Sequence, residues 1–105
     1  MEQRVLDGLL ANQAVLQVAL LDKDGFVTST APRHDDTVDQ LAQAVGPLDA
    51  SGSARITIQG EHACVMAHRL KAERVLVLKC ETGSNLGSVR ASFDQAIAAL
   101  NALVI

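Results

Sequence analysis

An apolar run at residues 14–21 sets the first limit on how this chain folds. It reads Ala-Val-Leu-Gln-Val-Ala-Leu-Leu, so both alternating faces are apolar apart from Gln17. A strand of this kind has to be covered above and below, as in a sheet with helices on both faces. The turn formers Asp22-Lys23-Asp24-Gly25 follow at once and lead into a second extended stretch from Phe26 to Thr30. The spacing predicts a central strand and a hairpin with residues 22–25 as its loop.

Apolar residues at helical spacing predict three helices, over residues 2–12, 35–47 and 83–103. The second is expected to begin in an acidic stretch and to end at Gly46-Pro47. Alternating patterns predict three more strands, at 54–59, 62–70 and 74–80. Turns this short forbid parallel crossovers except across the second helix. The order α-β-β-α-β-β-β-α therefore predicts one α+β domain spanning 1–105, a five-stranded antiparallel sheet with helices on both faces.

Turn lengths predict which residues face each other in the last three strands. A two-residue turn at Gly60-Glu61 pairs Ile56 with Val65, and a four-residue loop at 71–74 pairs His68 with Val77. One face is then uniformly apolar, and we expect the first and third helices to cover it. Its members are Ile56, Ile58, Ala63, Val65, Ala67, Leu76, Leu78 and Cys80. In this register Cys64 and Cys80 lie on opposite faces, so the side chains diverge and we expect two buried free thiols.

Composition excludes several classes of function. Nine Lys and Arg stand against twelve Asp and Glu, and Trp and Tyr are absent, so neither a phosphate-binding stripe nor a base-stacking platform is expected. The apolar runs are shorter than the roughly 20 residues of a membrane span. The acidic start and the two cysteines favour a cytoplasmic protein. No hydrolase, phosphate-loop or dinucleotide motif occurs, so we expect neither an enzyme nor a cofactor.

Four possible metal ligands alternate along the strand at 62–70, namely His62, Cys64, Met66 and His68. Soft sulfur and imidazole ligands suit copper or zinc, so a small metal- or ligand-sensing domain using His62, Cys64 and His68 is an alternative function. Residues on one face of a strand lie roughly 6.6 Å apart, however, so one ion can reach two neighbours but hardly four. We therefore interpret the set mainly as half-buried strand residues, and no metal site is predicted.

The strand at 54–59 has a partner only on one side if the strands follow chain order. Its other edge then exposes unpaired N–H and C=O groups beside Ile56 and Ile58, a hazard that proteins usually cover. A homodimer that pairs this strand with its twofold mate would remove the edge. The alternative is a monomer whose edge is screened by the loop at 46–53.

An ordered set of segments resembles the roadblock domains of the dynein light-chain type. The set comprises Leu9-Leu10, the run Val15 to Leu21, Asp22-Lys23-Asp24-Gly25 with Val27, Leu41-Ala42, Val75 to Leu78, and Asn85 to Arg90. The resemblance spans nearly the whole chain and implies a profilin-like sheet with the second helix on one face and the other two helices on the opposite face. It also implies a homodimer that joins third strands and second helices. Bacterial members similar to the gliding-motility regulator act on a small Ras-like GTPase by binding its switch regions, and eukaryotic members serve as scaffolds.

This resemblance and the edge argument predict two surfaces. The dimer interface is expected at Val38, Leu41, Val45, Ala54, Arg55, Ile56, Thr57, Ile58 and Gln59. The GTPase is expected to contact the solvent face of the second helix, at Asp36, Asp39, Gln40 and Gln43.

Overall fold

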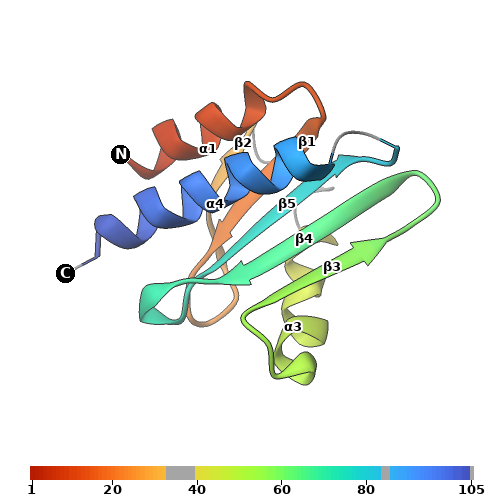
Figure 1. Ribbon diagram of the computed structural model, residues 1–105. Helices are drawn as coiled ribbons and strands as arrows, with labels where there is room; N and C mark the ends of the chain where they lie inside the picture. The colour runs from red at the N-terminus through yellow and green to blue at the C-terminus, as the bar shows by residue number, and fades with distance from the viewer. Residues whose placement is uncertain (33–39, 84–85, 105) are drawn as a thin grey trace.

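The computed structural model describes residues 1–32, 40–83 and 86–104 of the chain, and within them a single antiparallel sheet forms the centre (Figure 1). The elements are α1 (Glu2–Leu10), β1 (Val15–Leu21), β2 (Val27–Ala31), η1 (Ala42–Ala44), α3 (Val45–Ser51), β3 (Arg55–Gln59), β4 (Ala63–Arg69), η2 (Lys71–Glu73), β5 (Val75–Glu81) and α4 (Leu86–Ala102). The strands lie in the order β2-β1-β5-β4-β3, so β5 is central and β3 is an edge strand. The predicted α+β class and five-stranded sheet are confirmed.

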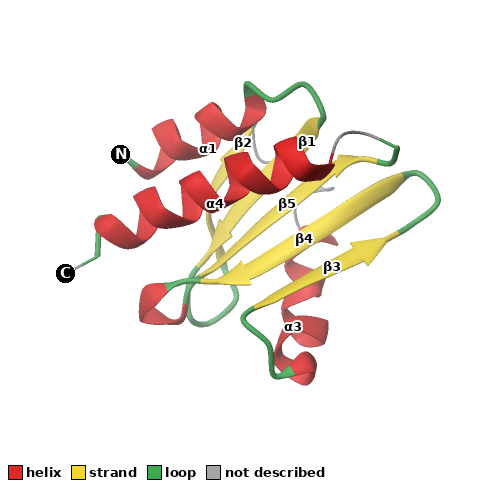
Figure 2. Cartoon of the chain, in the orientation of Figure 1, coloured by secondary structure: helices red, strands yellow, loops and turns green. Residues whose placement is uncertain are grey.

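Helices cover the sheet on both sides (Figure 2), and the sheet separates two apolar cores. Helices α1 and α4 lie side by side on one face, where Leu6, Phe93 and Leu100 are fully buried against the sheet. The consecutive elements η1 and α3 cover part of the opposite face, where Leu48 is fully buried. The apolar run in β1 contributes side chains to both cores, as predicted for a strand covered above and below.

The helical segment before β3 ends later than the sequence pattern predicted. It passes through Gly46-Pro47 and continues to Ser51, where Gly52 closes it with a left-handed φ of 68°. Pro47 is the third residue of α3, and the first-turn N–H groups of a helix have no intrahelical acceptor. A proline is tolerated near the start of a helix, and the glycine in the left-handed conformation is the true end signal.

A bulge changes which residues of β1 are buried. The pairing of β1 with β5 shifts between Val15 and Gln17, and Leu16 is 40% exposed whereas Gln17 is 6% exposed. The extra residue turns the side chain of Leu16 outward and that of Gln17 inward. The first hairpin also differs from prediction: Phe26 belongs to the turn, and the Asp22 carboxylate accepts hydrogen bonds from the N–H groups of Asp24 and Phe26.

Both later hairpins have registers other than the predicted ones. Ile56 pairs with Ala67 rather than Val65, because the turn takes residues 60–62 out of the strands and Gly60 donates to the Ala63 carbonyl. That shift is two residues, so the faces of β3 and β4 stay as predicted relative to each other. His68 pairs with Leu76 rather than Val77, a shift of one residue.

The one-residue shift moves β5 to the other face relative to β4, so the predicted uniform apolar face is wrong. Ile56, Val65 and Ala67 pack with the core under α3, not under α1 and α4 as predicted. Ala72 and Glu73 in the turn after β4 have positive φ. The Leu70 N–H donates to the Arg74 carbonyl and closes the turn over residues 70–74. Cys64 and Cys80 are direct partners across β4 and β5, not residues on opposite faces, although both are buried and free as expected. Burial and the neighbouring Cys64 thiol raise the pKa of Cys80 to about 11.

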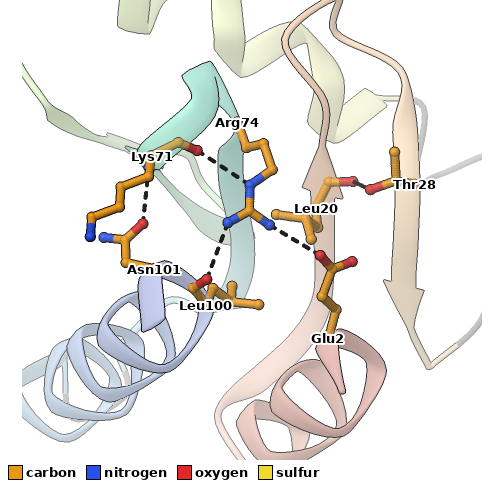
Figure 3. A network of polar contacts seen from close by, with 7 residues as sticks. All are labelled: Glu2, Leu20, Thr28, Lys71, Arg74, Leu100 and Asn101. Carbon is orange, nitrogen blue, oxygen red and sulfur yellow. Dashed lines mark hydrogen bonds and ion pairs between the residues drawn. The ribbon is translucent and has the colours of Figure 1, made fainter. Parts of the chain in front are cut away.

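Arg74 connects the turn after β4 to both helices of the α1 and α4 layer (Figure 3). Its guanidinium donates to Glu2 Oε1 and to the Leu100 carbonyl, each at 3.1 Å, and its Nε donates to the Lys71 carbonyl at 3.3 Å. Asn101 Oδ1 accepts from the Lys71 N–H at 2.9 Å. The Leu100 carbonyl lies in the last turn of α4 and also accepts from the Leu103 N–H at 3.2 Å, so Arg74 gives this carbonyl a second donor from another element.

Candidate functional site

The edge strand β3 is the surface that the structure leaves open for pairing. It pairs with β4 on one side, and no other described strand lies on its second side. Ile56 is half-buried against the α3 core, whereas Ile58 is 42% exposed. Neither proline nor a bulge protects this edge in the described part of the chain. An apolar edge of this kind is a template for another strand.

A hollow of about 280 Å³ lies beside this edge, between the helical segment and the sheet. Its lining residues are Gln40, Gln43, Ala44, Pro47, Ile58 and Val65. The apolar part of the lining comes from both layers, since Pro47 belongs to α3 and Val65 to β4. The hollow and the edge strand therefore form one continuous surface, which we call the β3 surface.

The structure places the predicted dimer residues in three environments. Val38 lies outside the described residues. Leu41 is buried in the core of the single chain, and Val45 packs partly against that core, so these two hold the helix on the sheet. The remaining members, which run from Ala54 through β3, are exposed or half-buried along the edge: Ala54, Arg55, Ile56, Thr57, Ile58 and Gln59.

Of the predicted partner-binding residues, Gln40 and Gln43 are exposed and line the hollow. Asp36 and Asp39 lie outside the described residues. Ala44, Pro47 and Val65 also line the hollow but were missed by the sequence analysis. A helix continuing through Pro47, with Leu48 as its last core residue, is the signal that could have found the first two.

A charged and aromatic cluster ties the start of β3 to α4. Arg55 and His68 are direct cross-strand partners, and Arg55 Nε donates to His68 Nδ1 at 3.1 Å. The guanidinium carbon of Arg55 lies 5.1 Å from the centre of the Phe93 ring, and Asp94 on α4 pairs with the same guanidinium. The His68 ring meets Phe93 edge-on, with centres 6.5 Å apart. Burial and the nearby Arg55 lower the pKa of His68, and Asp94 partly opposes them.

The alternative metal ligands do not converge on one ion. The side chain of His62 is 96% exposed in the turn before β4, whereas Cys64 is buried beside Cys80. His68 lies four residues along the strand from Cys64, about 13 Å at the usual rise of a strand. No group of three or more His, Cys, Asp or Glu in the described ranges is placed to hold a metal ion. The geometry gives no support to the metal-sensing alternative.

Solved structures with the same arrangement cover nearly the whole chain. The Roadblock/LC7 domain from Streptomyces avermitilis aligns with a TM-score of 0.84 at 12% identity, over 97% of this chain and 96% of that one. The chain has the roadblock fold. MglB from Myxococcus xanthus aligns with a TM-score of 0.81 at 21% identity, over 97% and 93% of the two chains. MglB in a tetrameric arrangement gives a TM-score of 0.78 at 23% identity, over 95% and 85%.

These likenesses are in the fold, since the identities are low. No family model and no curated protein sequence matches the chain. The structure confirms the division of the helices that the resemblance implied, with α1 and α4 on one face of the sheet and the helical segment before β3 on the other. Within the described residues, no helix combines the length and apolarity that crossing a membrane requires.

Proposed function

We propose that this chain is a homodimeric, cytoplasmic platform that pairs through the β3 surface and binds a small Ras-like GTPase, altering its nucleotide cycle. The observation that carries the proposal is the open edge of β3, with Ile58 42% exposed beside the hollow under Gln43 and Pro47. A twofold axis along this edge would pair β3 with its own copy and satisfy the free backbone groups of both strands.

Self-association is consistent with the solved neighbours, among which one MglB has a tetrameric arrangement. The GTPase partner rests on the resemblance to bacterial roadblock proteins and on the neighbour from Thermus thermophilus, which is a gliding protein. In this proposal the paired helical segments offer Gln40, Gln43 and the preceding acidic residues Asp36 and Asp39 to the GTPase. The chain acts by binding and supplies no catalytic side chain.

Light scattering tests the dimer with a matched pair of variants. The wild type should show about twice the 11.1 kDa chain mass. Ile58→Lys places a charge on the edge and should give the monomer mass, whereas Leu16→Lys should leave the dimer intact. Leu16 is exposed to nearly the same extent, 40% against 42%, but lies on β1, two strands away from β4 and three from β3. A wild type at the monomer mass, or equal losses in the two variants, would refute pairing through β3.

Titration with the small Ras-like GTPase encoded nearest to this gene tests the partner. The GTPase should bind the wild type in at least one nucleotide state, and its hydrolysis or exchange rate should change. Gln40→Arg with Gln43→Arg should weaken GTPase binding. Both glutamines also line the hollow of the β3 surface, so light scattering on the same variant shows whether the dimer is lost as well. Absence of binding in both nucleotide states would sink the GTPase proposal while leaving the dimer standing.

A further inference from the structure

The cluster around Arg55 contains a hydrogen bond that only one protonation state of His68 allows. An arginine Nε always carries a hydrogen, so it can only donate. The contact at 3.1 Å therefore requires His68 Nδ1 to be an unprotonated acceptor, with the ring neutral. Protonation at Nδ1 removes the acceptor and places a second positive charge against the guanidinium.

We propose that His68 is a pH-sensitive latch that holds Arg55, and with it the first residue of β3, in the pairing conformation of the edge strand. This inference rests on the proposed self-pairing and assigns a regulation to the same surface. Neutral His68 keeps Arg55 in place, and an acidic medium releases it.

Three contacts beyond the hydrogen bond fix the latch geometry in the neutral state. Arg55 lies over the ring of Phe93, pairs with Asp94, and leaves only 28% of its side chain exposed. The His68 ring packs edge-on against the same phenyl ring, which is fully buried. Both side chains therefore contact the same ring on α4.

The charges acting on His68 come from two elements. Arg55 on β3 opposes protonation, while Asp94 on α4 favours it and is 60% exposed, so solvent weakens its effect. Leu76, the partner of His68 on β5, carries no charge. Burial is the largest cause that lowers the pKa of His68 and Arg55 adds to it, so the transition lies below the ordinary pKa of 6.5.

Release of Arg55 acts on the edge because β3 is short. The five residues Arg55–Gln59 pair with β4, Arg55 is the first of them, and just before it the Ala54 carbonyl accepts from the Arg69 N–H. A guanidinium that leaves Phe93 and Asp94 no longer anchors the end of the strand to α4. Fewer ordered residues remain along the outer edge to pair with a second copy.

The test measures the dissociation constant of the dimer by analytical ultracentrifugation at about pH 7.5 and about pH 5.5, on either side of the ordinary histidine pKa. For the wild type the constant should rise at least about threefold on acidification, the scale of losing one hydrogen bond. His68→Gln retains an acceptor that does not titrate and should abolish most of the rise. His62→Gln is the matched control: its side chain is 96% exposed and remote from Arg55, so the rise should persist.

A second measurement separates the latch from the dimer. The Arg55 Nε–H resonance, followed by NMR in dilute wild-type protein, should shift with a midpoint equal to that of the His68 ring and below the ordinary histidine value. If no dimer forms at any pH, the proposed function fails and this titration alone decides the latch. An Arg55 resonance that ignores His68, or an acid-induced dissociation equal in wild type and His68→Gln, would overturn the proposal.

Discussion

Replacing Arg74 by alanine should lower the free energy of unfolding by about 2–3 kcal/mol. The side chain is 12% exposed and donates three hydrogen bonds, to Glu2, Leu100 and Lys71. A net hydrogen bond contributes about 1 kcal/mol, and both carbonyls lose the guanidinium as a donor, although the Leu100 carbonyl keeps the Leu103 N–H. The Glu2 contact adds less than about 1 kcal/mol, because that carboxylate is 41% exposed and water screens it.

Urea denaturation of two comparison variants distinguishes the parts of this contribution. Glu2→Gln removes only the ion pair and should cost less than about 1 kcal/mol. Arg74→Lys keeps the positive charge near the end of α4 but loses the several donors of the guanidinium. Its free energy of unfolding should therefore lie between those of the wild type and Arg74→Ala. A cost below about 0.5 kcal/mol for Arg74→Ala, or a cost for Glu2→Gln equal to that of Arg74→Ala, would contradict the proposed role of the guanidinium.

Three further predictions concern stability and thiol reactivity. Gly52→Ala should cost about 1 kcal/mol in urea denaturation, since φ is 68° there and Cβ has open space, so only backbone strain opposes it; a neutral result contradicts the assigned helix end. Cys64 and Cys80 should react with a thiol reagent only as fast as the chain opens, because both are buried and the pKa of Cys80 is raised to about 11; reaction at the rate of a free thiol contradicts their burial. Folding lowers the pKa of His68, so the unfolded chain binds the proton at a higher pH than the folded chain does. The free energy of unfolding should therefore fall as the pH decreases from about 6.5 to the pKa of His68 in the folded chain. His68→Gln should remove that component, and an unchanged pH profile in this variant would contradict the assignment.

Much of the fold could be predicted because most elements carry a local periodic signal. The apolar stripe of α4 is buried from Val89 to Leu100, as its helical spacing requires, although Leu103 lies beyond the helix and is 37% exposed. The position of β3 at the sheet edge follows from chain order and short turns. The edge strand was therefore placed correctly from the sequence, whereas the lining of the hollow and the cluster at Arg55 were not predicted.

The register of the strands accounts for most of those misses. In the predicted register Arg55 does not face His68, so the contact between them could not be anticipated. The turn after β4 has two residues with positive φ, Ala72 and Glu73, neither of which is a glycine. No sequence pattern predicts positive φ at these two residues. The turn is stabilised by contacts far away in the chain, those of Arg74 with α1 and α4.

The sequence by itself determined the kinds of elements, their order and the need for two covered faces, since helical and alternating periodicities are local properties of the chain. Only the tertiary structure decided which residue of β5 lies opposite which residue of β4, and so that Cys64 meets Cys80 and that Leu76 meets His68. A strand repeats its faces every two residues, so a turn longer by one residue reverses every later side chain. That turn length is selected by the packing of the whole domain rather than by the residues of the turn.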